Sequence, residues 1–366
     1  MTTTPVVTVL QASIVSVVKG FLGRRKDKDN RKRKEIYSGN HIERDGTPRS
    51  HVSGAAITVP QSMVIPHTAS YGITSMTVKD FLKIHRILPG HNLKLLNLTQ
   101  SSKTIMVSKT VRRVRKICPN LRSLILENFN FLAPHRKRRV KLEDFPPRLK
   151  FLSLRGSVID IKTLLVSTTR AKTLINLVIL DLGSCFFVND EKAKTQGSSI
   201  SWPSMPHLQE LYLEGCPFLN SSISMQQIAM GSPALRVIDV EGTQFDVKSF
   251  QCFQYLQHLE ELYVGNTNVD DSYLLSLQQH VLPTLTVVCL VQAHVTEIGL
   301  TYLCQSSPGL RLVRLERSRC SYKFVREFQA LFPCVKLEWS GGSRMDSVLM
   351  HQSCDHYHRK YPPGEG

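Results

Sequence analysis

The sequence lacks a paired set of cysteines. Its nine cysteines are an odd number, they are scattered from Cys118 to Cys354, and no two form a C-x-x-C pair. A small secreted domain usually shows an even number of cysteines that form a disulfide framework. We therefore predict reduced, structural thiols in a protein of the cytoplasm, the nucleus or both.

A long uninterrupted hydrophobic run is also missing. The most apolar early stretch, residues 5–22, contains Thr8, Gln11 and Lys19, whereas a membrane-spanning helix needs about 20 predominantly apolar residues. We predict no membrane span. The first 26 residues contain no acidic residue and no clear A-x-A cleavage site, so a mitochondrial targeting segment stays open as an alternative interpretation.

Signatures of catalysis and of bound cofactors are missing as well. The chain has no G-x-S-x-G motif, no P-loop and no dinucleotide-binding fingerprint. His351, Cys354, His356 and His358 gather near the end of the chain, but a structural zinc site needs four ligands held by rigid turns. We predict no metal, no cofactor and no enzymatic activity.

Charge is distributed unevenly along the chain. There are 47 basic and 29 acidic residues, a net charge of +18, yet residues 156–302 hold 7 basic and 14 acidic residues. Seven basic residues near the start form a candidate nuclear localisation signal. They are Arg24, Arg25, Lys26, Arg31, Lys32, Arg33 and Lys34.

What the sequence does contain is an internal repeat. The pattern L-x-x-L-x-L recurs nine times with conservative replacements, and its first leucines lie 24 to 31 residues apart. This spacing is typical of leucine-rich repeats that each hold one strand and one helix. The motifs begin at Leu93, Leu121, Leu149, Leu177, Leu208, Leu235, Leu259, Leu285 and Leu310. We predict an α/β leucine-rich-repeat solenoid (horseshoe) of about nine repeats, with a parallel concave sheet and convex helices.

A small residue prevails at the ninth position of each repeat. Small side chains fit the tight turn that follows the strand, and polar ones can bond its backbone. The nine residues are Ser101, Phe129, Ser157, Cys185, Cys216, Thr243, Thr267, Ala293 and Ser318. Phe129 is the exception.

The repeat pattern also sets the predicted boundaries. Residues 1–75 lack periodicity and are predicted to be a basic, mostly disordered extension. Residues 76–92 are predicted to form a short capping helix, and residues 93–340 the leucine-rich-repeat domain. Residues 341–366 carry no repeat and are predicted to be a disordered C-terminal tail.

One repeat resembles a known subtype. The stretch VTEIGLTYLCQSSPGL, residues 295–310, resembles the cysteine-containing leucine-rich repeat, and parts of the same signature occur at residues 269–277 and 118–121. This subtype is typical of the F-box/LRR-repeat family, with a ribonuclease-inhibitor-like fold. The resemblance covers about residues 91–338.

The resemblance implies a function. F-box/LRR proteins are substrate-recognition subunits of SCF-type E3 ubiquitin ligases, so it implies a Skp-type adaptor and a cullin as partners. The chain has no recognisable F-box ahead of the repeats. A tryptophan-bearing helix belongs to that motif, whereas Trp202 and Trp339 both lie far downstream.

Residues between the leucines are predicted to line the concave face, because strand side chains alternate. In the acidic part of the chain these positions hold carboxylates, which attract Lys and Arg, and tyrosines, which offer contact area with a polar tip. We predict a protein-binding face for a basic peptide segment, with a merely solvated face as the alternative. Its residues are Asp181, Glu210, Tyr212, Glu214, Asp239, Glu241, Glu261 and Tyr263.

A second charged group is basic and is predicted on the helix and loop side of the early repeats. It suits nucleic acid, an acidic protein or an anionic membrane, or is simply solvated. It comprises Arg112, Arg113, Arg115, Lys116, Arg136, Lys137, Arg138, Arg139 and Lys141. Two functions therefore stay open beside the ubiquitin ligase: an F-box-independent adaptor or regulatory protein, and a nuclear nucleic-acid-associated factor. In each case we expect a monomer within a larger complex.

Overall fold

A computed structural model represents the 366-residue chain. The structure describes residues 71–78, 81, 90–99, 107–132, 140–160, 174–188, 202–216, 225–244, 247–277 and 282–339. The chain divides into two compact units: the first holds residues 1–164, 168–179 and 188–190, and the second holds residues 165–167, 180–187 and 191–366.

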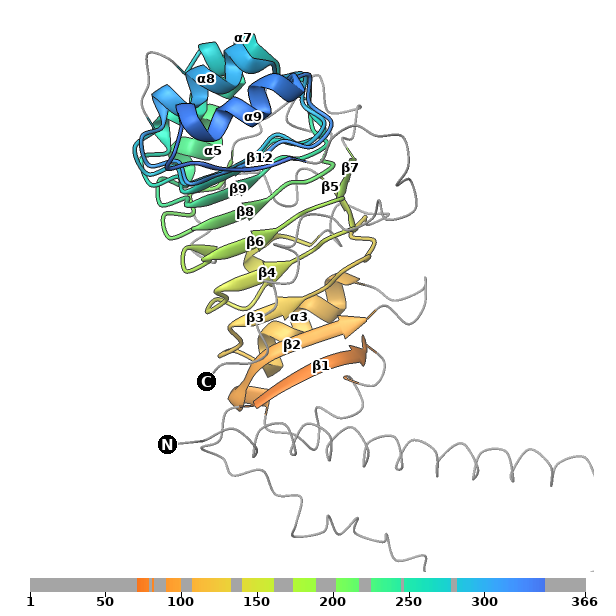
Figure 1. Ribbon diagram of the computed structural model, residues 1–366. Helices are drawn as coiled ribbons and strands as arrows, with labels where there is room; N and C mark the ends of the chain where they lie inside the picture. The colour runs from red at the N-terminus through yellow and green to blue at the C-terminus, as the bar shows by residue number, and fades with distance from the viewer. Residues whose placement is uncertain are drawn as a thin grey trace, which may run out of the picture. The chain divides into compact units, whose positions relative to one another are not determined.

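The described part of the first unit is built on parallel strands in the order β1-β2-β3-β4. An α-helix of 11 residues, 3-10 turns and a further short strand accompany them, and Figure 1 shows the helix beside the strands. The elements are β1 (Tyr71–Thr77), η2 (Gly90–Asn92), β2 (Leu93–Thr99), α3 (Val107–Ile117), β3 (Ser123–Ile125), η4 (Leu142–Asp144), β4 (Phe151–Ser153) and β5 (Val158–Asp160).

The second unit continues the same strand–helix alternation, with strands in the order β6-β8-β9-β10-β11-β12-β13. Helices α7, α8 and α9 lie next to one another in one layer (Figure 1). The strands are β6 (Ile179–Asp181), β7 (Phe186–Val188), β8 (Glu210–Tyr212), β9 (Val237–Asp239), β10 (Glu261–Tyr263), β11 (Val287–Cys289), β12 (Leu312–Arg314) and β13 (Lys336–Glu338). The helices are α5 (Met225–Gly231), α6 (Val247–Gln251), η8 (Cys252–Tyr255), α7 (Asp271–Leu275), α8 (Glu297–Ser306) and α9 (Tyr322–Leu331).

The leucines of the repeat motif form the core. Leu259, Leu262 and Val264 around β10 are all buried, and the same holds for Leu121, Leu124 and Leu126 around β3. The strands that carry these motifs are rows of a parallel sheet, whereas β5 and β7 belong to a separate two-stranded sheet. The fold is therefore the predicted α/β leucine-rich-repeat solenoid, while the number of repeats stays a prediction.

A left-handed residue lies three positions after the end of each of the strands β3, β4, β6, β8, β9, β10, β11 and β12. Gly215 (φ +65°) and Gly242 (φ +67°) occupy this place without strain, and Asn266 (φ 51°) adopts the same conformation. The small residue that comes next closes the turn, as predicted. The hydroxyls of Thr243 and Thr267 each donate to the carbonyl three residues earlier, at 2.6 Å.

Carboxylates tie neighbouring repeats together on the helix side of the second unit. Asp271, the first residue of α7, accepts from the Thr296 backbone N–H at 2.8 Å and from the Thr296 hydroxyl at 2.6 Å. Glu297, the first residue of α8, accepts from the Ser321 N–H at 2.7 Å. Thr296 and Ser321 are themselves the N-caps of α8 and α9. A Cβ at Gly299 would collide with Asp271, so the close approach of the two helices needs glycine there.

The predicted boundary between residues 75 and 76 is wrong, because a strand that the sequence did not reveal runs across it. β1 spans the predicted division between residues 75 and 76, and it pairs in parallel with β2. Its sequence, YGITSMT, has no leucine motif, so the repeat pattern could not locate it. Of the predicted helix over 76–92, the structure describes Val78 and Phe81 as helical and buried, and residues 90–92 as η2. Residues 1–70 and the tail 341–366 lie outside the described residues.

Candidate functional site

The predicted acid and tyrosine row lies on one face of the sheet in the second unit. The register places Tyr212 beside Asp239 and Asp239 beside Tyr263. Asp181 belongs to the neighbouring strand, because the Leu182 N–H donates to the Tyr212 carbonyl at 2.9 Å. Strand alternation puts all four side chains on the face opposite the buried leucines. The structure therefore brings this row together as predicted.

The side chains of this row are buried. The exposed fractions are 1% for Asp181, 5% for Tyr212, 0% for Asp239 and 3% for Tyr263. Parallel strands lie about 4.8 Å apart, so neighbouring side chains in one row pack against each other. This corrects the expectation that the two tyrosines supply open contact area.

The tyrosine hydroxyls instead hold the carboxylates that flank the row. Tyr212 Oη donates to Glu210 Oε2 at 2.8 Å, and Tyr263 Oη donates to Glu261 Oε2 at 2.6 Å. Both glutamates are half-buried. Burial, helped by the adjacent carboxylate, raises the pKa of Tyr212 and of Tyr263 well above the usual value for tyrosine. Both phenols therefore stay protonated and keep donating at physiological pH.

The two aspartates of the row have a local structural role. Asp181 Oδ1 accepts from the Gly183 N–H, and Asp239 Oδ1 accepts from the Glu241 N–H, each at 3.0 Å. An aspartate that bonds the backbone two residues ahead stabilises a turn. Each aspartate therefore stabilises the turn that directly follows its strand.

Glu214 and Glu241 complete the predicted set and follow β8 and β9. The Gly215 N–H donates to the Glu241 carbonyl at 2.7 Å, so these two residues lie on adjacent rows. Glu241 Oε1 also accepts from the Cys289 thiol at 3.1 Å. Both glutamates are half-buried, which leaves part of each side chain open to solvent. We name Glu210, Glu214, Glu241 and Glu261 the acidic face.

Basic residues occupy the same sheet face beyond β11. Arg314 stands in register with Cys289 on one side and Glu338 on the other. Its Nε donates to Glu338 Oε2 at 2.9 Å, and Lys336 Nζ lies 2.8 Å from Glu338 Oε1. The charge pattern of the sequence did not reveal this cluster, because Arg314 and Glu338 lie 24 residues apart. The negative charge of the acidic face therefore does not extend to β12 and β13, where Glu338 is neutralised by ion pairs with Arg314 and Lys336.

The described residues contain no group of three His, Cys, Asp or Glu side chains placed to hold a metal ion, and none of their helices is long and apolar enough to cross a membrane. Burial raises the pKa of the Cys118 thiol to about 12 and that of Cys320 to about 11. A thiol with a raised pKa is a poor nucleophile, so these cysteines pack as core residues.

The other predicted site residues divide between described and undescribed segments. Arg112 on α3 is paired with Asp144 at 2.9 Å, while Arg113 and Lys116 of the same helix are exposed. Arg136 to Arg139 lie outside the described residues, as do the candidate nuclear localisation residues 24–34 and the histidines of the tail.

No protein-family model matches this chain, and no curated protein matches it. Among solved structures with a similar fold is the mouse RP105/MD-1 complex, with 16% identity over 74% of this chain and 45% of that chain and a TM-score of 0.47. This chain thus spans under half the length of the RP105/MD-1 chain that it matches.

Two other similar structures are known. One is an internalin, inlF, from Listeria monocytogenes str. 4b F2365, with 15% identity over 75% of this chain and 74% of that chain and a TM-score of 0.42. The other is from the Rad7 and Elc1 complex in yeast, with 14% identity over 74% of this chain and 80% of that chain and a TM-score of 0.35.

Proposed function

We propose that this chain is a non-catalytic protein-binding scaffold whose acidic face holds a basic segment of a partner in an extended conformation. The observation that carries the proposal is the grouping of four half-buried glutamates on adjacent rows of one sheet face. Carboxylates in such an array attract Lys and Arg and exclude acidic partners.

The spacing of the acidic face suits an extended peptide. Glu210 and Glu261 both stand in register with Val237, so two strand spacings separate them. This separation is about 9.6 Å, which is about three residues of extended chain. In a polyproline II segment, which rises about 3.1 Å per residue with three residues per turn, basic residues three apart lie on one side and can meet both carboxylates.

The tyrosines reduce the entropy cost of binding. A free glutamate loses rotamer freedom when it pairs with a partner. Glu210 and Glu261 are already held by phenol hydroxyls at 2.8 and 2.6 Å, so less freedom remains to be lost. The role of Tyr212 and Tyr263 in this proposal is to position the carboxylates.

The partner complex that we propose is an SCF-type ubiquitin ligase, in which this chain holds the substrate. The support is the resemblance of residues 295–310 to the repeats of F-box/LRR proteins. Affinity purification followed by mass spectrometry tests this part. Recovery of a Skp-type adaptor and a cullin supports it, and their absence under stringent conditions replaces it with an F-box-independent adaptor.

Binding of a synthetic peptide tests the acidic face. The probe is a labelled peptide with arginine at every third position, separated by serines, and the full chain is titrated by fluorescence anisotropy. We expect Glu210→Gln combined with Glu261→Gln to raise the Kd about tenfold or more, since close charge pairs carry such effects.

A matched variant separates local binding from overall charge. Glu316→Gln with Glu327→Gln removes the same charge from exposed positions of the same unit outside the acidic face, and its Kd should change by less than about threefold. Equal losses in both variants would show that only net charge matters and would overturn the proposal.

A further inference from the structure

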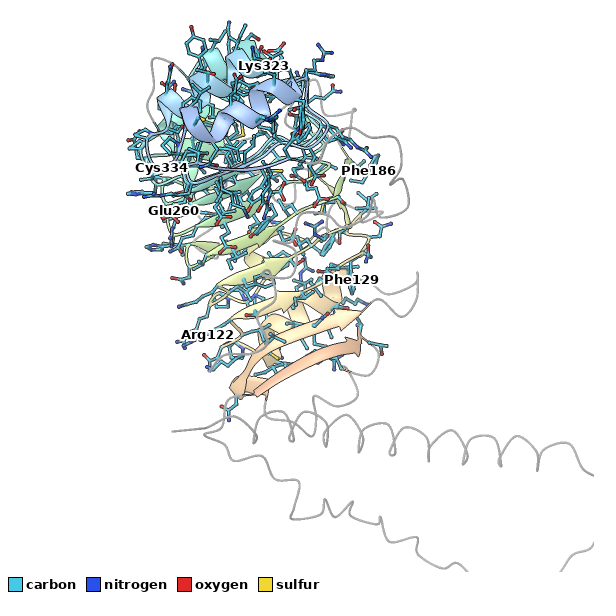
Figure 2. The ribbon with its side chains drawn as sticks, viewed as in Figure 1. Arg122, Phe129, Phe186, Glu260, Lys323 and Cys334 are labelled. Atoms are coloured by element: carbon cyan, nitrogen blue, oxygen red, sulfur yellow. The ribbon has the colours of Figure 1, made fainter. Side chains whose placement is uncertain are left out.

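We infer that the first unit carries a second, independent binding surface: a row of three cations, Lys94, Arg122 and Lys150, that takes a short acidic segment of a protein partner. Each of these residues directly follows the first leucine of its repeat motif. We name this position the leading column and the three cations the basic ladder. Figure 2 labels Arg122 of the ladder.

The backbone fixes the three residues side by side. The Arg122 N–H donates to the Lys94 carbonyl at 2.9 Å, and the Lys150 N–H donates to the Arg122 carbonyl at 2.7 Å. The Val178 N–H donates in turn to the Lys150 carbonyl at 2.8 Å. The ladder therefore consists of three consecutive rows, about 4.8 Å apart, and ends at an apolar residue.

The three side chains have no ionic partner in the part of the chain that the structure describes. Arg122 and Lys150 are exposed and Lys94 is half-buried. Acids of the first unit have other partners: Asp144 pairs with Arg112 at 2.9 Å, Glu127 accepts from the Ser153 hydroxyl at 3.1 Å, and Glu143 lies 4.0 Å from Lys141. Like charges on adjacent strands repel one another, so an anionic partner would relieve this repulsion.

The fold itself does not require like charges at these positions. In the second unit the leading column holds Arg236 followed by Glu260, and the Glu260 N–H donates to the Arg236 carbonyl at 2.7 Å in the same backbone pattern. There the two side chains form a bidentate ion pair, at 2.9 and 2.6 Å. The same backbone geometry thus accepts a neutralised pair.

A fourth cation is tied to the ladder. Arg148 lies two residues before Lys150, and its Nη1 donates to Asn120 Oδ1 at 2.8 Å. Asn120 lies two residues before Arg122. This bond holds one guanidinium close to the strand starts, where it adds to the positive field that the ladder produces.

The size and surroundings of the ladder favour an acidic peptide over nucleic acid. Proteins that bind nucleic acid strongly make about 6–10 phosphate contacts, whereas the ladder with Arg148 offers four cations. Single-stranded nucleic acid also needs aromatic platforms for its bases. The sheet-face residues next to the ladder are Leu95, Ser123 and Phe151, which provide one aromatic ring. Three or four Asp or Glu residues in an extended segment match the row.

Peptide titration of the full chain tests the ladder. The probe is a labelled peptide of alternating glutamate and serine, and a 12-nucleotide single-stranded DNA serves as a second probe. We expect Lys94→Gln, Arg122→Gln and Lys150→Gln together to raise the Kd for the peptide about tenfold or more, while Arg122→Lys alone keeps binding within about threefold because it retains the charge.

The matched control is Lys109→Gln, Arg113→Gln and Lys116→Gln, which removes the same charge from exposed positions of α3. Its peptide affinity should stay within about threefold of the natural chain. An equal loss in this control, or tighter ladder-dependent binding of the DNA than of the peptide, would overturn the inference. Glu210→Gln with Glu261→Gln should leave acidic-peptide binding unchanged, so failure of the acidic face and failure of the ladder are distinguishable.

Discussion

The two units place opposite charges on their sheets and hold them differently. In the second unit the carboxylates of the acidic face are held by neighbours: Tyr212 and Tyr263 donate to Glu210 and Glu261. In the first unit the cations of the basic ladder are aligned only by the backbone. The backbone of the repeat therefore fixes the position of each Cα atom. Hydrogen bonds from neighbouring side chains determine how firmly a side chain is oriented.

The units also differ in what their carboxylates hold on the helix side. In the second unit Asp271 and Glu297 accept from backbone N–H groups at the N-caps of the next repeat, whereas Asp144 of the first unit pairs with the exposed Arg112 side chain of the preceding repeat. Removing a tie between repeats should therefore cost more stability than changing a charge of the leading column.

The largest effect should come from Asp271→Ala. It removes both acceptors that hold Thr296, the N-cap of α8, which should lower the free energy of unfolding by about 1–3 kcal/mol. Urea denaturation followed by circular dichroism measures the change. Asp271→Asn keeps one acceptor oxygen and should lose less. A loss below about 0.5 kcal/mol for the alanine variant would show that the tie has little energetic weight.

Acidification should have a smaller effect that is confined to the second unit. Hydrogen bonds from Ser321 lower the pKa of Glu297, and hydrogen bonds from Ser272 lower that of Asp270. A lowered pKa stabilises the folded state above the carboxyl's unfolded pKa, and this contribution is lost as the pH falls through the folded value.

Thermal unfolding between about pH 5 and pH 2 checks this expectation. Glu297→Gln with Asp270→Asn should show a shallower fall in Tm over this range than the natural chain. An unchanged slope would place the acid sensitivity of the fold elsewhere.

The smallest effects should come from exchanging the charges of the leading column. Arg122→Glu places a carboxylate between Lys94 and Lys150 and should stabilise the chain by up to about 1 kcal/mol. Glu260→Arg, at the position labelled in Figure 2, puts a second cation beside Arg236 and should destabilise it by a similar amount. Denaturation midpoints at low salt measure both, and 1 M salt should reduce both. The same sign for the two variants would refute the comparison.

The sequence predicted the core and the face of each strand residue because both follow from periodicity. The register of Tyr212, Asp239 and Tyr263 follows from equal positions in consecutive motifs. Their burial could not be predicted, since alternation gives the direction of a side chain and not how closely the next row packs against it. The hydroxyl bonds to Glu210 and Glu261 depend on that packing.

The basic ladder escaped sequence analysis for a different reason. Lys94, Arg122 and Lys150 lie 28 residues apart along the chain, so no local charge run marks them. Only the superposition of repeats places them in one column. The signal that could have found them is the residue directly after the first leucine of each motif.

The hydrogen bonds that the carboxylates of Asp271 and Glu297 accept run in the same sense along the chain. Asp271 supports the N-cap of the helix that follows it, and Glu297 does the same one repeat later, so in both cases support passes from one repeat to the next. Removing α9 from the C-terminal side would leave Thr296 with its carboxylate. Disrupting an earlier repeat removes the hydrogen bonds that hold the N-cap of the next helix. Local unfolding should therefore extend toward the C-terminus rather than toward the N-terminus.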